Sequence, residues 1–433
     1  MVSVSLLDSL NRRRLDGRKG FLQEAIFPDK RSPSYSKDRL FVGWQKPMEW
    51  VEWEEHRGEW ESAGKWQPFY INISQSITEL ILGPRGSGKT WLLRGQLSRL
   101  AKAKYHCAHV SDIKNEMISN NKPALKKYAY LLHKARHEVP EAIPTVALLP
   151  KFLERAYIDY PKGNQKFQLS FRDITEKDLI TIFGCEKDRD KIEIMKKLYA
   201  EITSLNITTF EEMSDYIMDL RELNAQAKKK LILAIDNLER EQVFGDEYSK
   251  DIVEILKKGE VLSLNLKGYD EFAHAYSQSY VSCIVNRLRR ARRAKELPRP
   301  LYLFADEAHA FCPNKGDPAS KKELIDVINV DRLHGVSLIL ATQYPEQLPR
   351  DDVLKQITHF FLPYNIDPDT RKFVLDLAGV RRREDQYTDK WKKFWAKLKK
   401  HEWCYINRET KKPAKIKPAS PLCRHAEEEK TDF

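Results

Sequence analysis

Cysteine is scarce in this chain of 433 residues, and no two of the six cysteines form a C-x-x-C pair. The sequence therefore lacks both a disulfide framework and the paired spacing of common zinc modules, which favours a reduced, cytoplasmic protein. His401-x-x-Cys404 and Cys423-x-His425 could together supply four zinc ligands. Because this spacing is unusual for zinc, we favour scattered surface residues over a metal site.

Long apolar runs are also missing. No stretch reaches the roughly 18 apolar residues that a membrane-spanning helix needs, so we expect no membrane span. The first residues are apolar, but Asp8 interrupts them and Arg12–Arg14 follow rather than precede them. That order is wrong for a signal peptide.

Acidic side chains are outnumbered by basic ones. Lys and Arg total 75 against 63 Asp and Glu, which gives a net charge of +12. This excess favours a polyanionic partner, with nucleic acid ahead of an anionic membrane, although a charge that serves solubility alone would look the same. A chain of this length is expected to form two or three structural units.

The most informative stretch is Thr78–Thr90, in which an apolar strand leads through a glycine-rich turn into a helix from Trp91 to about Ala103. It contains the pattern G-x-x-x-x-G-K-[ST], whose glycines let the backbone present its N–H groups to phosphate oxygens. Lys89 would reach the β and γ phosphates, and the Thr90 hydroxyl would bind Mg²⁺. The predicted nucleotide-binding residues are Gly83, Pro84, Arg85, Gly86, Ser87, Gly88, Lys89 and Thr90.

Two adjacent carboxylates end a second apolar strand, Leu301–Ala305. In an NTPase with a phosphate-binding loop, an acid at this place holds the Mg²⁺ shell, and the next one can orient or deprotonate the attacking water. We therefore assign Asp306 to the metal and Glu307 to catalysis. His309 lies two residues further on, and we interpret it as a packing residue.

A third apolar strand, Val336–Ala341, carries candidate residues at both of its ends. Gln343 would lie at the carboxyl edge, where doubly wound folds bind their ligands, and could sense the γ-phosphate. Arg332 precedes the strand, so it would lie at the far edge from its own nucleotide. It could reach the nucleotide of a neighbouring subunit, as an arginine finger in trans does.

Alternating strands and helices predict an α/β, doubly wound and mostly parallel sheet. We predict a Trp-rich extension at 1–74, a core at 75–117 and 243–365, a helical insertion at 118–242 and a basic extension at 366–433. In the insertion, Thr followed by acidic residues marks the start of helices near 175 and 209. Further expected strands are Tyr105–Ser111 and Val261–Leu266.

The flanking segments allow two interpretations. Five tryptophans between 44 and 66 could stack on bases, but their acidic neighbours favour packing onto the core. The basic run Arg287–Lys295 is expected to be a solvated helix face, with DNA or subunit contact as the alternative. Beyond Lys411 the chain is expected to be extended or disordered.

Four motifs in this order resemble the HerA/FtsK family of ring-shaped, DNA-translocating ATPases. They are G-P-R-G-S-G-K-T, the segment Val110–Glu116 (close to D-x-K-x-E), F-A-D-E-A-H-A-F and R-L-H-G-V-S-L-I-L-A-T-Q, within a match from about Pro68 to Pro363. The resemblance implies a RecA-like core and a homohexamer. It assigns Lys89 and Thr90 to nucleotide and Mg²⁺, Asp306 and Glu307 to catalysis, Arg332 to the finger and Asp112 to a further acid on the second strand.

The sequence departs from the family in lacking a recognisable N-terminal barrel and the membrane helices of FtsK relatives, which favours a HerA-like branch. The string Asp-Glu-Ala-His also occurs in superfamily 2 helicases, but those need two RecA-like lobes, and only one is visible here. We therefore predict an ATP- and Mg²⁺-dependent, hexameric motor on double-stranded DNA. The loop 314–322 is its candidate pore loop, and a nuclease is a candidate partner. The alternative is a regulatory ATPase ring that recruits a partner without translocating DNA.

Overall fold

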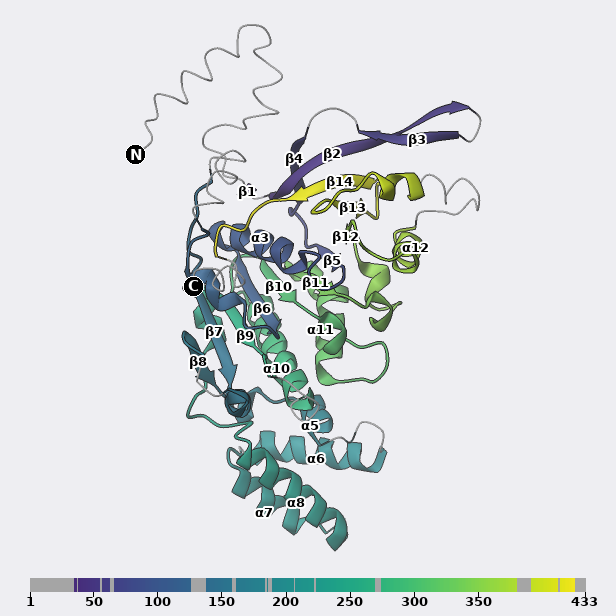
Figure 1. Cartoon of the computed structure of the whole chain (residues 1–433). Helices are drawn as coiled ribbons and strands as arrows, with labels where there is room; N and C mark the ends of the chain where they lie inside the picture. Colours follow the sequence, from purple (N-terminus) through teal and green to yellow (C-terminus); the bar gives the residue numbers. More distant parts are fainter. Residues whose placement is uncertain are drawn as a thin grey trace.

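The computed structural model places the strands of the chain in one continuous sheet (Figure 1). It describes residues 35–36, 38–54, 57–62, 66–125, 138–157, 161–183, 185, 189–205, 207–221, 223–268, 274–379, 391–411 and 413–424. Along the sheet the strand order is β1-β2-β14-β13-β12-β5-β11-β10-β6-β9-β7-β8, and β3 and β4 pair with β2.

Eight neighbouring strands, from β12 to β8 in this order, are parallel. Nearly all of their residues are buried, as a parallel sheet covered on both faces requires. The predicted doubly wound α/β fold is confirmed. The bounds are β5 Thr78–Leu82, β6 His106–Asp112, β7 Thr145–Pro150, β8 Asn164–Phe167, β9 Val261–Asn265, β10 Leu301–Ala305, β11 Val336–Thr342 and β12 His359–Pro363.

Helices cover both faces of this parallel region. On one face, α3 (Lys89–Lys102) packs its leucines against alternate strand residues such as Ile81 and Phe304. On the other face, α10 (His274–Arg293) and α11 (Ala319–Asn329) pack against the intervening strand residues.

The other helices of the described residues are α5 Glu176–Ile182, α6 Arg189–Leu205, α7 Phe210–Asp219, α8 Ala225–Arg240, α9 Ile252–Lys257 and α12 Pro368–Leu377. Short 3₁₀ turns lie at η1 Met117–Asn121, η2 Lys151–Ala156, η3 Phe171–Asp173, η4 Ala308–Ala310, η5 Asp331–His334, η6 Pro345–Gln347 and η7 Leu354–Gln356.

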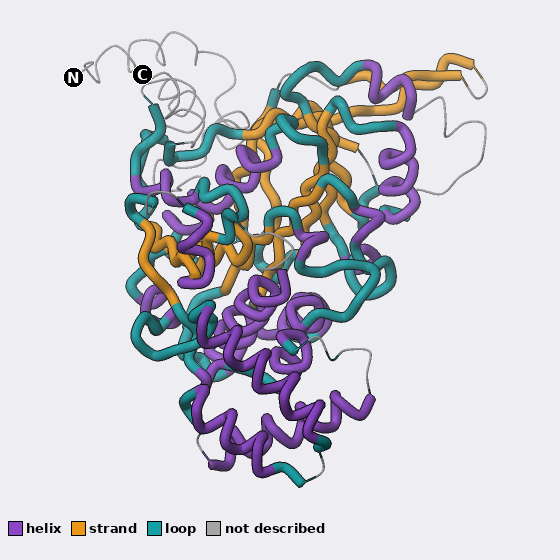
Figure 2. The backbone as a smooth tube through the Cα atoms, turned by 60° about the horizontal axis from the view of Figure 1, so that its bottom comes forward, coloured by secondary structure: helices purple, strands orange, loops and turns teal. Residues whose placement is uncertain are grey.

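The stretch 118–242 combines helices and strands. Helices α5 and α7 begin at Thr175 and Thr209, each with the reciprocal capping box that the sequence indicates. Helices α6, α7 and α8 project from one end of the sheet (Figure 2). The expected helical insertion also contributes strands to the sheet, because the buried strand β7 pairs with β9, and β8 continues the sheet beyond it.

The two flanking segments meet in the antiparallel part of the sheet. Strand β14 (Pro413–Pro418) lies between β13 (Trp403–Asn407) and the long N-terminal strand β2 (Arg39–Glu54). Residues 413–418 are therefore extended, as one of the two expected alternatives had it, but they form a paired strand of the sheet and not a free tail. The remaining strands are β1 Tyr35–Ser36, β3 Arg57–Ser62 and β4 Gln67–Asn72.

Aromatic side chains of both flanking segments pack onto the fold. Trp44 and Trp66 are half-buried, while the side chains of the other tryptophans between 44 and 66 lie outside the description. In the basic C-terminal stretch, Trp391, Phe394 and Trp395 are buried. The aromatic side chains that alternate with cations in this stretch therefore form one face of the segment, and that face packs against the rest of the fold.

The last described residues cross the outer side of α3. Arg94 of that helix contacts Asn120 and the carbonyl of Arg424, and the Ser98 hydroxyl accepts from the N–H of Leu422. The C-terminal segment is therefore attached to the helix that follows the phosphate-binding loop. Among the described residues, no helix has the length and apolar character to span a membrane.

One carboxylate lies inside the sheet. Glu79 of β5 is fully buried, and the Gln96 side-chain amide donates to one of its oxygens. Burial raises the pKa of Glu79 to about 8, although the Gln96 bond opposes this rise. Since the folded chain then holds a proton that the unfolded chain loses above pH 4.5, Glu79 should lower stability as the pH rises towards 8.

We expect Glu79→Gln to remove this pH dependence, because a neutral amide has no charge to desolvate. Relative to the unmodified protein, the variant should gain stability between pH 5 and pH 8, by at most about 1.4 kcal/mol per pH unit. Urea unfolding at several pH values would measure the difference. A difference in free energy that does not change with pH would contradict the assignment of the proton to Glu79.

Candidate nucleotide-binding and hydrolysis site

The loop between β5 and α3 has a backbone that only glycine can follow. Gly83, Gly86 and Gly88 all have positive φ, at 142°, 76° and 95°. A Cβ on Gly83 would also lie 2.6 Å from the Pro363 ring and from the Ser87 hydroxyl. Helix α3 begins directly after Gly88, so its N-terminus lies at the end of the loop, as a phosphate site requires.

Lys89 turns back over this loop. Its ammonium donates to the carbonyl oxygens of Gly83, at 2.7 Å, and Pro84, at 3.3 Å. Burial lowers the pKa of Lys89, while the nearby Glu307 and Asp306 favour its charged form. Phosphate oxygens can replace the two carbonyls as acceptors with a small movement of the side chain.

Asp306 and Glu307 follow β10 at the same edge of the sheet. One Asp306 oxygen accepts from the Glu307 N–H at 2.9 Å, and the Gln343 amide donates to the Glu307 carboxylate at 2.8 Å. Glu307 has a φ of 45°, which is unusual for a residue other than glycine and is typical of functional sites. The structure thus brings the two predicted acids together with Gln343. The strand that the acids follow, β10, is two strands away from β5, which leads into the phosphate loop.

His309 does more than pack. Its ring contacts Tyr344 edge-on, and its Nδ1 lies 2.9 Å from the Thr342 hydroxyl and 3.7 Å from the Glu307 carboxylate. Burial lowers the pKa of His309 more than the nearby carboxylates raise it, which favours a neutral ring. The interpretation of His309 as a packing residue alone missed its contact with Glu307.

Asp112 ends β6 and shapes the turn that follows. Its carboxylate accepts from the backbone N–H groups of Glu116, at 3.0 Å, and Met117, at 2.9 Å. The predicted further acid therefore lies at the site edge with both oxygens engaged by its own turn. Within that turn, the Lys114 ammonium lies 3.6 Å from the Asp306 carboxylate, a contact that the sequence reasoning missed.

The oxygens at this edge fit Mg²⁺. The Thr90 hydroxyl and the Asp306 carboxylate are the hard donors that this ion prefers, and it binds through few protein ligands plus phosphate and water oxygens. The described residues contain no cluster of three or more metal-binding His, Cys, Asp or Glu side chains. Of the four residues that could have supplied zinc ligands, Cys404 and Cys423 are buried free thiols, and His425 lies outside the described residues.

Arg332 lies in η5, exposed, immediately before β11. Gln343 directly follows the same seven-residue strand, so the strand that lies between the two residues is about 23 Å long. The structure therefore places Arg332 at the opposite edge from its own phosphate loop, as predicted. Its neighbour Leu333 is 86% exposed, the highest value among the exposed large apolar side chains of the described residues.

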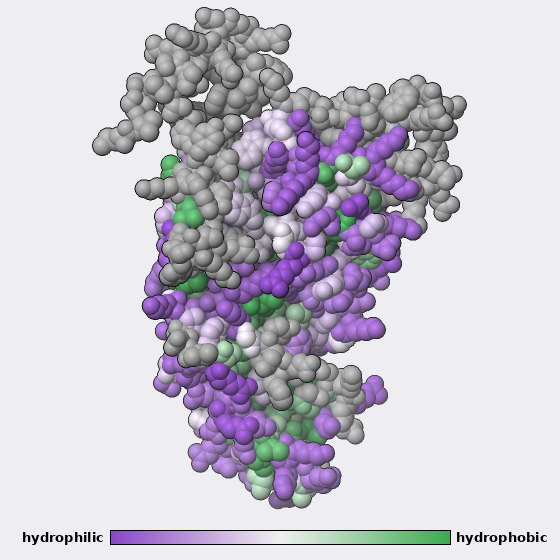
Figure 3. Space-filling view, viewed as in Figure 1, coloured by the Kyte–Doolittle hydropathy of each residue, from purple (hydrophilic) through white to green (hydrophobic). Residues whose placement is uncertain are grey.

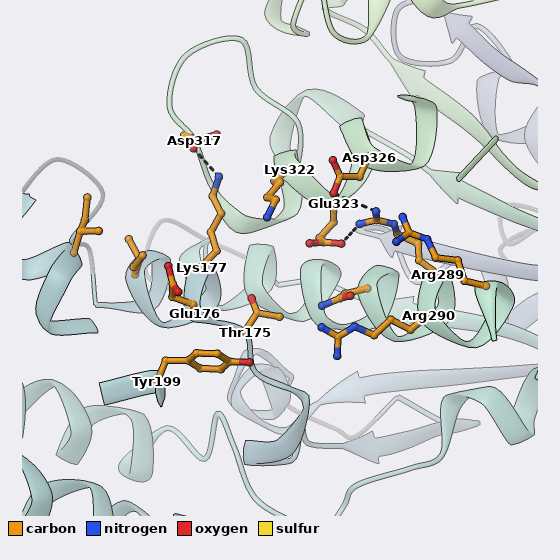
Figure 4. Close-up of a pocket in the computed structure, with 14 residues that line it drawn as sticks. Thr175, Glu176, Lys177, Tyr199, Arg289, Arg290, Asp317, Lys322, Glu323 and Asp326 are labelled. Atoms are coloured by element: carbon orange, nitrogen blue, oxygen red, sulfur yellow. Dashed lines mark hydrogen bonds and ion pairs between the residues drawn. The ribbon is translucent and has the colours of Figure 1, made fainter. Parts of the chain in front are cut away.

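Buried ion pairs hold the turn that carries Arg332. The Asp331 carboxylate is fully buried and pairs with Arg289 and Arg293 of α10. Arg289 also pairs with Glu323 and Asp326 of α11, along a hollow of about 520 Å³ between these helices and α5 and α6 (Figure 4). The expectation of a solvated face for Arg287–Lys295 is therefore wrong for Arg289.

Comparison with known proteins gives one curated protein with partial sequence similarity and solved structures with a similar fold. The chain is 22% identical to the DNA double-strand break repair helicase HerA of Sulfolobus acidocaldarius over 193 residues, which are 42% of this chain and 38% of that protein. VirB4 of Thermoanaerobacter pseudethanolicus superposes with a TM-score of 0.52 at 12% identity, over 81% of this chain and 93% of that one. The bacterial conjugative coupling protein TrwBdeltaN70, in its trigonal form with sulphate, gives 0.50 at 14% identity, over 81% and 88%.

The resemblance to the HerA/FtsK family is confirmed. No family model matches the chain. The similarity to HerA covers well under half of that protein's length, whereas the likeness to VirB4 covers most of both chains and gives the RecA-like fold. The phosphate loop and the paired acids lie at the same edge of the sheet, an arrangement that fits the binding and hydrolysis of ATP with Mg²⁺.

We expect Lys89→Ala to abolish hydrolysis by weakening phosphate binding, and Glu307→Gln to bind ATP while hydrolysing it at least about 100-fold more slowly. Binding of a fluorescent ATP analogue and phosphate release would measure the two effects separately. Glu239→Gln, on the exposed part of α8, is the matched control and should leave both unchanged. Hydrolysis by Glu307→Gln at the unmodified rate would show that another group activates the water.

Proposed function

We propose that this protein is an ATP-driven motor that moves along double-stranded DNA as a homohexameric ring. The observation that carries the proposal is the arrangement of β11, which has Gln343, bonded to Glu307, at one end and Arg332 at the other. Hydrolysis would then need an arginine from the next subunit. Coupling between neighbours of this kind suits a motor that works in steps around a ring.

We assign the residue roles in this motor as follows. Lys89 would bind phosphate, Thr90 and Asp306 would hold Mg²⁺, and Glu307 would act on the attacking water while Gln343 senses the γ-phosphate. Asp112 supports the site by folding the turn after β6. We keep 75–117 and 243–365 as the ATPase core, to which β7 and β8 add strands. The six buried free thiols support the predicted cytoplasmic location.

A ring needs two different surfaces that fit each other, because a head-to-tail contact that closes generates a cycle. One surface would be η5, where Leu333 and Val330, which is 44% exposed, flank Arg332. The other would be the nucleotide edge, where Tyr344 is 46% exposed beside the exposed Glu346. Apolar groups and opposite charges are thus available on the two opposite edges of one sheet.

The DNA contact is proposed for the loop after the Asp306–Glu307 pair. Residues 314–317 are exposed at its tip, and Lys321 closes the loop by donating to the Gly316 carbonyl at 2.8 Å. Lys315 and Lys322 remain exposed on it, where they can meet phosphates without reading bases. The net charge of +12 supports the same polyanionic partner.

A regulatory ring that recruits a protein partner is the second candidate. Two exposed apolar side chains favour it, Met218 on α7 and Leu233 on α8, at 56% and 59% exposure. Apolar surface is visible at that end of the molecule in Figure 3. Measuring ATP hydrolysis with and without duplex DNA separates the two functions: a motor should be stimulated, whereas the recruiter should be indifferent to DNA.

DNA binding should be tolerant of sequence and steeply dependent on salt. Each phosphate contact contributes about 0.9 to the slope of log K against log salt concentration, so Lys315→Gln with Lys322→Gln should reduce the slope by about 1.8. Fluorescence anisotropy of duplexes at several salt concentrations would measure it. Lys258→Gln, an exposed lysine after α9, is the control and should leave the slope unchanged. Affinity that does not depend on salt would argue against a grip on the backbone.

Arg332 should act across a subunit boundary. Arg332→Ala should lower hydrolysis by about 10³-fold or more while ATP affinity falls much less. Mixing Arg332→Ala with Glu307→Gln should restore activity, since some interfaces in a mixed ring join an intact Arg332 to an intact Glu307. Full activity of a monomer at high dilution would exclude the arrangement.

Leu333→Asp is the control for this mixing experiment, because it alters assembly without removing the arginine. We expect it to weaken association in sedimentation and to lower hydrolysis in proportion to the rings lost. In contrast, Arg332→Ala should form rings as well as the unmodified protein does.

A further inference from the structure

Two lysines approach the paired acids from opposite sides. Along the carboxyl edge of the sheet the strand order is β5-β11-β10-β6, so the loop carrying Lys89 lies on one side of β10 and the turn carrying Lys114 lies on the other. Lys89 belongs to the phosphate-binding pattern and has a known type of role. Lys114 does not belong to it, and the proposed function leaves its position unexplained.

The position of Lys114 is set by a folded turn. The Asp112 carboxylate accepts from the backbone of Glu116 and Met117, and Asn115 has a positive φ of 55°. These features reverse the chain directly after β6 and direct Lys114 towards β10. Its ammonium lies 3.6 Å from Asp306 Oδ2, with 38% of the lysine side chain exposed and 6% of the aspartate.

Asp306 therefore has a partner on each oxygen. Its Oδ1 accepts from the Glu307 N–H, and its Oδ2 faces the Lys114 ammonium. An oxygen that pairs with an ammonium is less available to a metal ion. At the same time, the ammonium offsets the negative charge that Asp306 and Glu307 present to an incoming phosphate chain.

We propose that Lys114 is a positioning residue that competes with Mg²⁺ for Asp306 and sets how strongly the site discriminates between metal-free and Mg²⁺-bound nucleoside triphosphate. In the metal-free site, Lys114 balances the charge of the acidic pair and makes it tolerant of an uncomplexed triphosphate. When Mg²⁺ arrives with the nucleotide, Asp306 exchanges its partner and the ammonium is released. The inference rests on the proposed nucleotide site but is independent of DNA movement and of the ring.

The inference gives two effects of opposite sign. In Lys114→Gln, a non-hydrolysable ATP analogue should bind about fivefold more weakly in EDTA, because two carboxylates then repel it with one cation fewer. The same variant should need about fivefold less Mg²⁺ to reach half-maximal tightening of that binding, because Asp306 Oδ2 has lost its competitor. Lys114→Arg keeps the charge and should lie close to the unmodified protein in both measurements.

The experiment titrates a fluorescent, non-hydrolysable ATP analogue in EDTA and then at fixed nucleotide with increasing MgCl₂, using the full chain. Lys258→Gln is the control for loss of one surface charge, and thermal unfolding confirms that the variants fold. Weaker metal-free binding together with a lower Mg²⁺ requirement supports the inference. Loss of both the metal-free binding and its tightening by Mg²⁺, which a merely structural lysine would give, overturns the inference. No change in either measurement overturns it as well. Failure of the unmodified protein to bind the analogue would instead contradict the nucleotide site itself.

Discussion

The parallel register of the three strands β5, β11 and β10 is the constraint on which the site depends. Ala341 and Thr342 of β11 lie beside Ile81 and Leu82 of β5, and Ala305 of β10 lies beside Leu340. Because parallel strands end at a common edge, this pairing brings together a loop, two acids and an amide that are far apart in the sequence. A slip of one residue would turn the alternating side chains to the wrong faces and separate the functional groups.

The same strand serves both edges of the sheet in the proposed ring. Gln343 bonds Glu307 at one end of β11, while Asp331, clamped by Arg289 and Arg293, holds the turn with Arg332 at the other end. Since the strand between them is buried along its whole length, it is a stiff connection. A shift of the turn that carries Arg332 would therefore reach Glu307 through packing rather than through a flexible loop.

Local patterns explain what the sequence predicted well. The phosphate loop, the acid pair and the capped helices each lie within a dozen residues, and their meaning follows from backbone geometry. The contacts that were missed are non-local: the ion pair between Lys114 and Asp306 joins two strands, and the Arg289–Asp331 pair joins a helix to a turn. The strands β7 and β14 were missed for a related reason, because their place in the sheet depends on partners that are distant in the sequence. The lysine of the D-x-K-x-E segment, two residues after the acid that ends β6, was the signal of the Lys114 contact.

The place of β14 between β13 and β2 has a consequence for how the chain is made. Lys415 of β14 pairs with Lys46 of β2. One edge of β2, near the beginning of the protein, is therefore unpaired until the residues around 415 have been synthesised. During synthesis, the long strand β2 keeps an open edge while the ATPase core is already emerging and able to collapse. Contacts of such high sequence separation form late and slowly, and an open edge is a site for pairing with other chains. Closure of the N-terminal part of the sheet is thus expected to be the last folding step, and the one most exposed to aggregation.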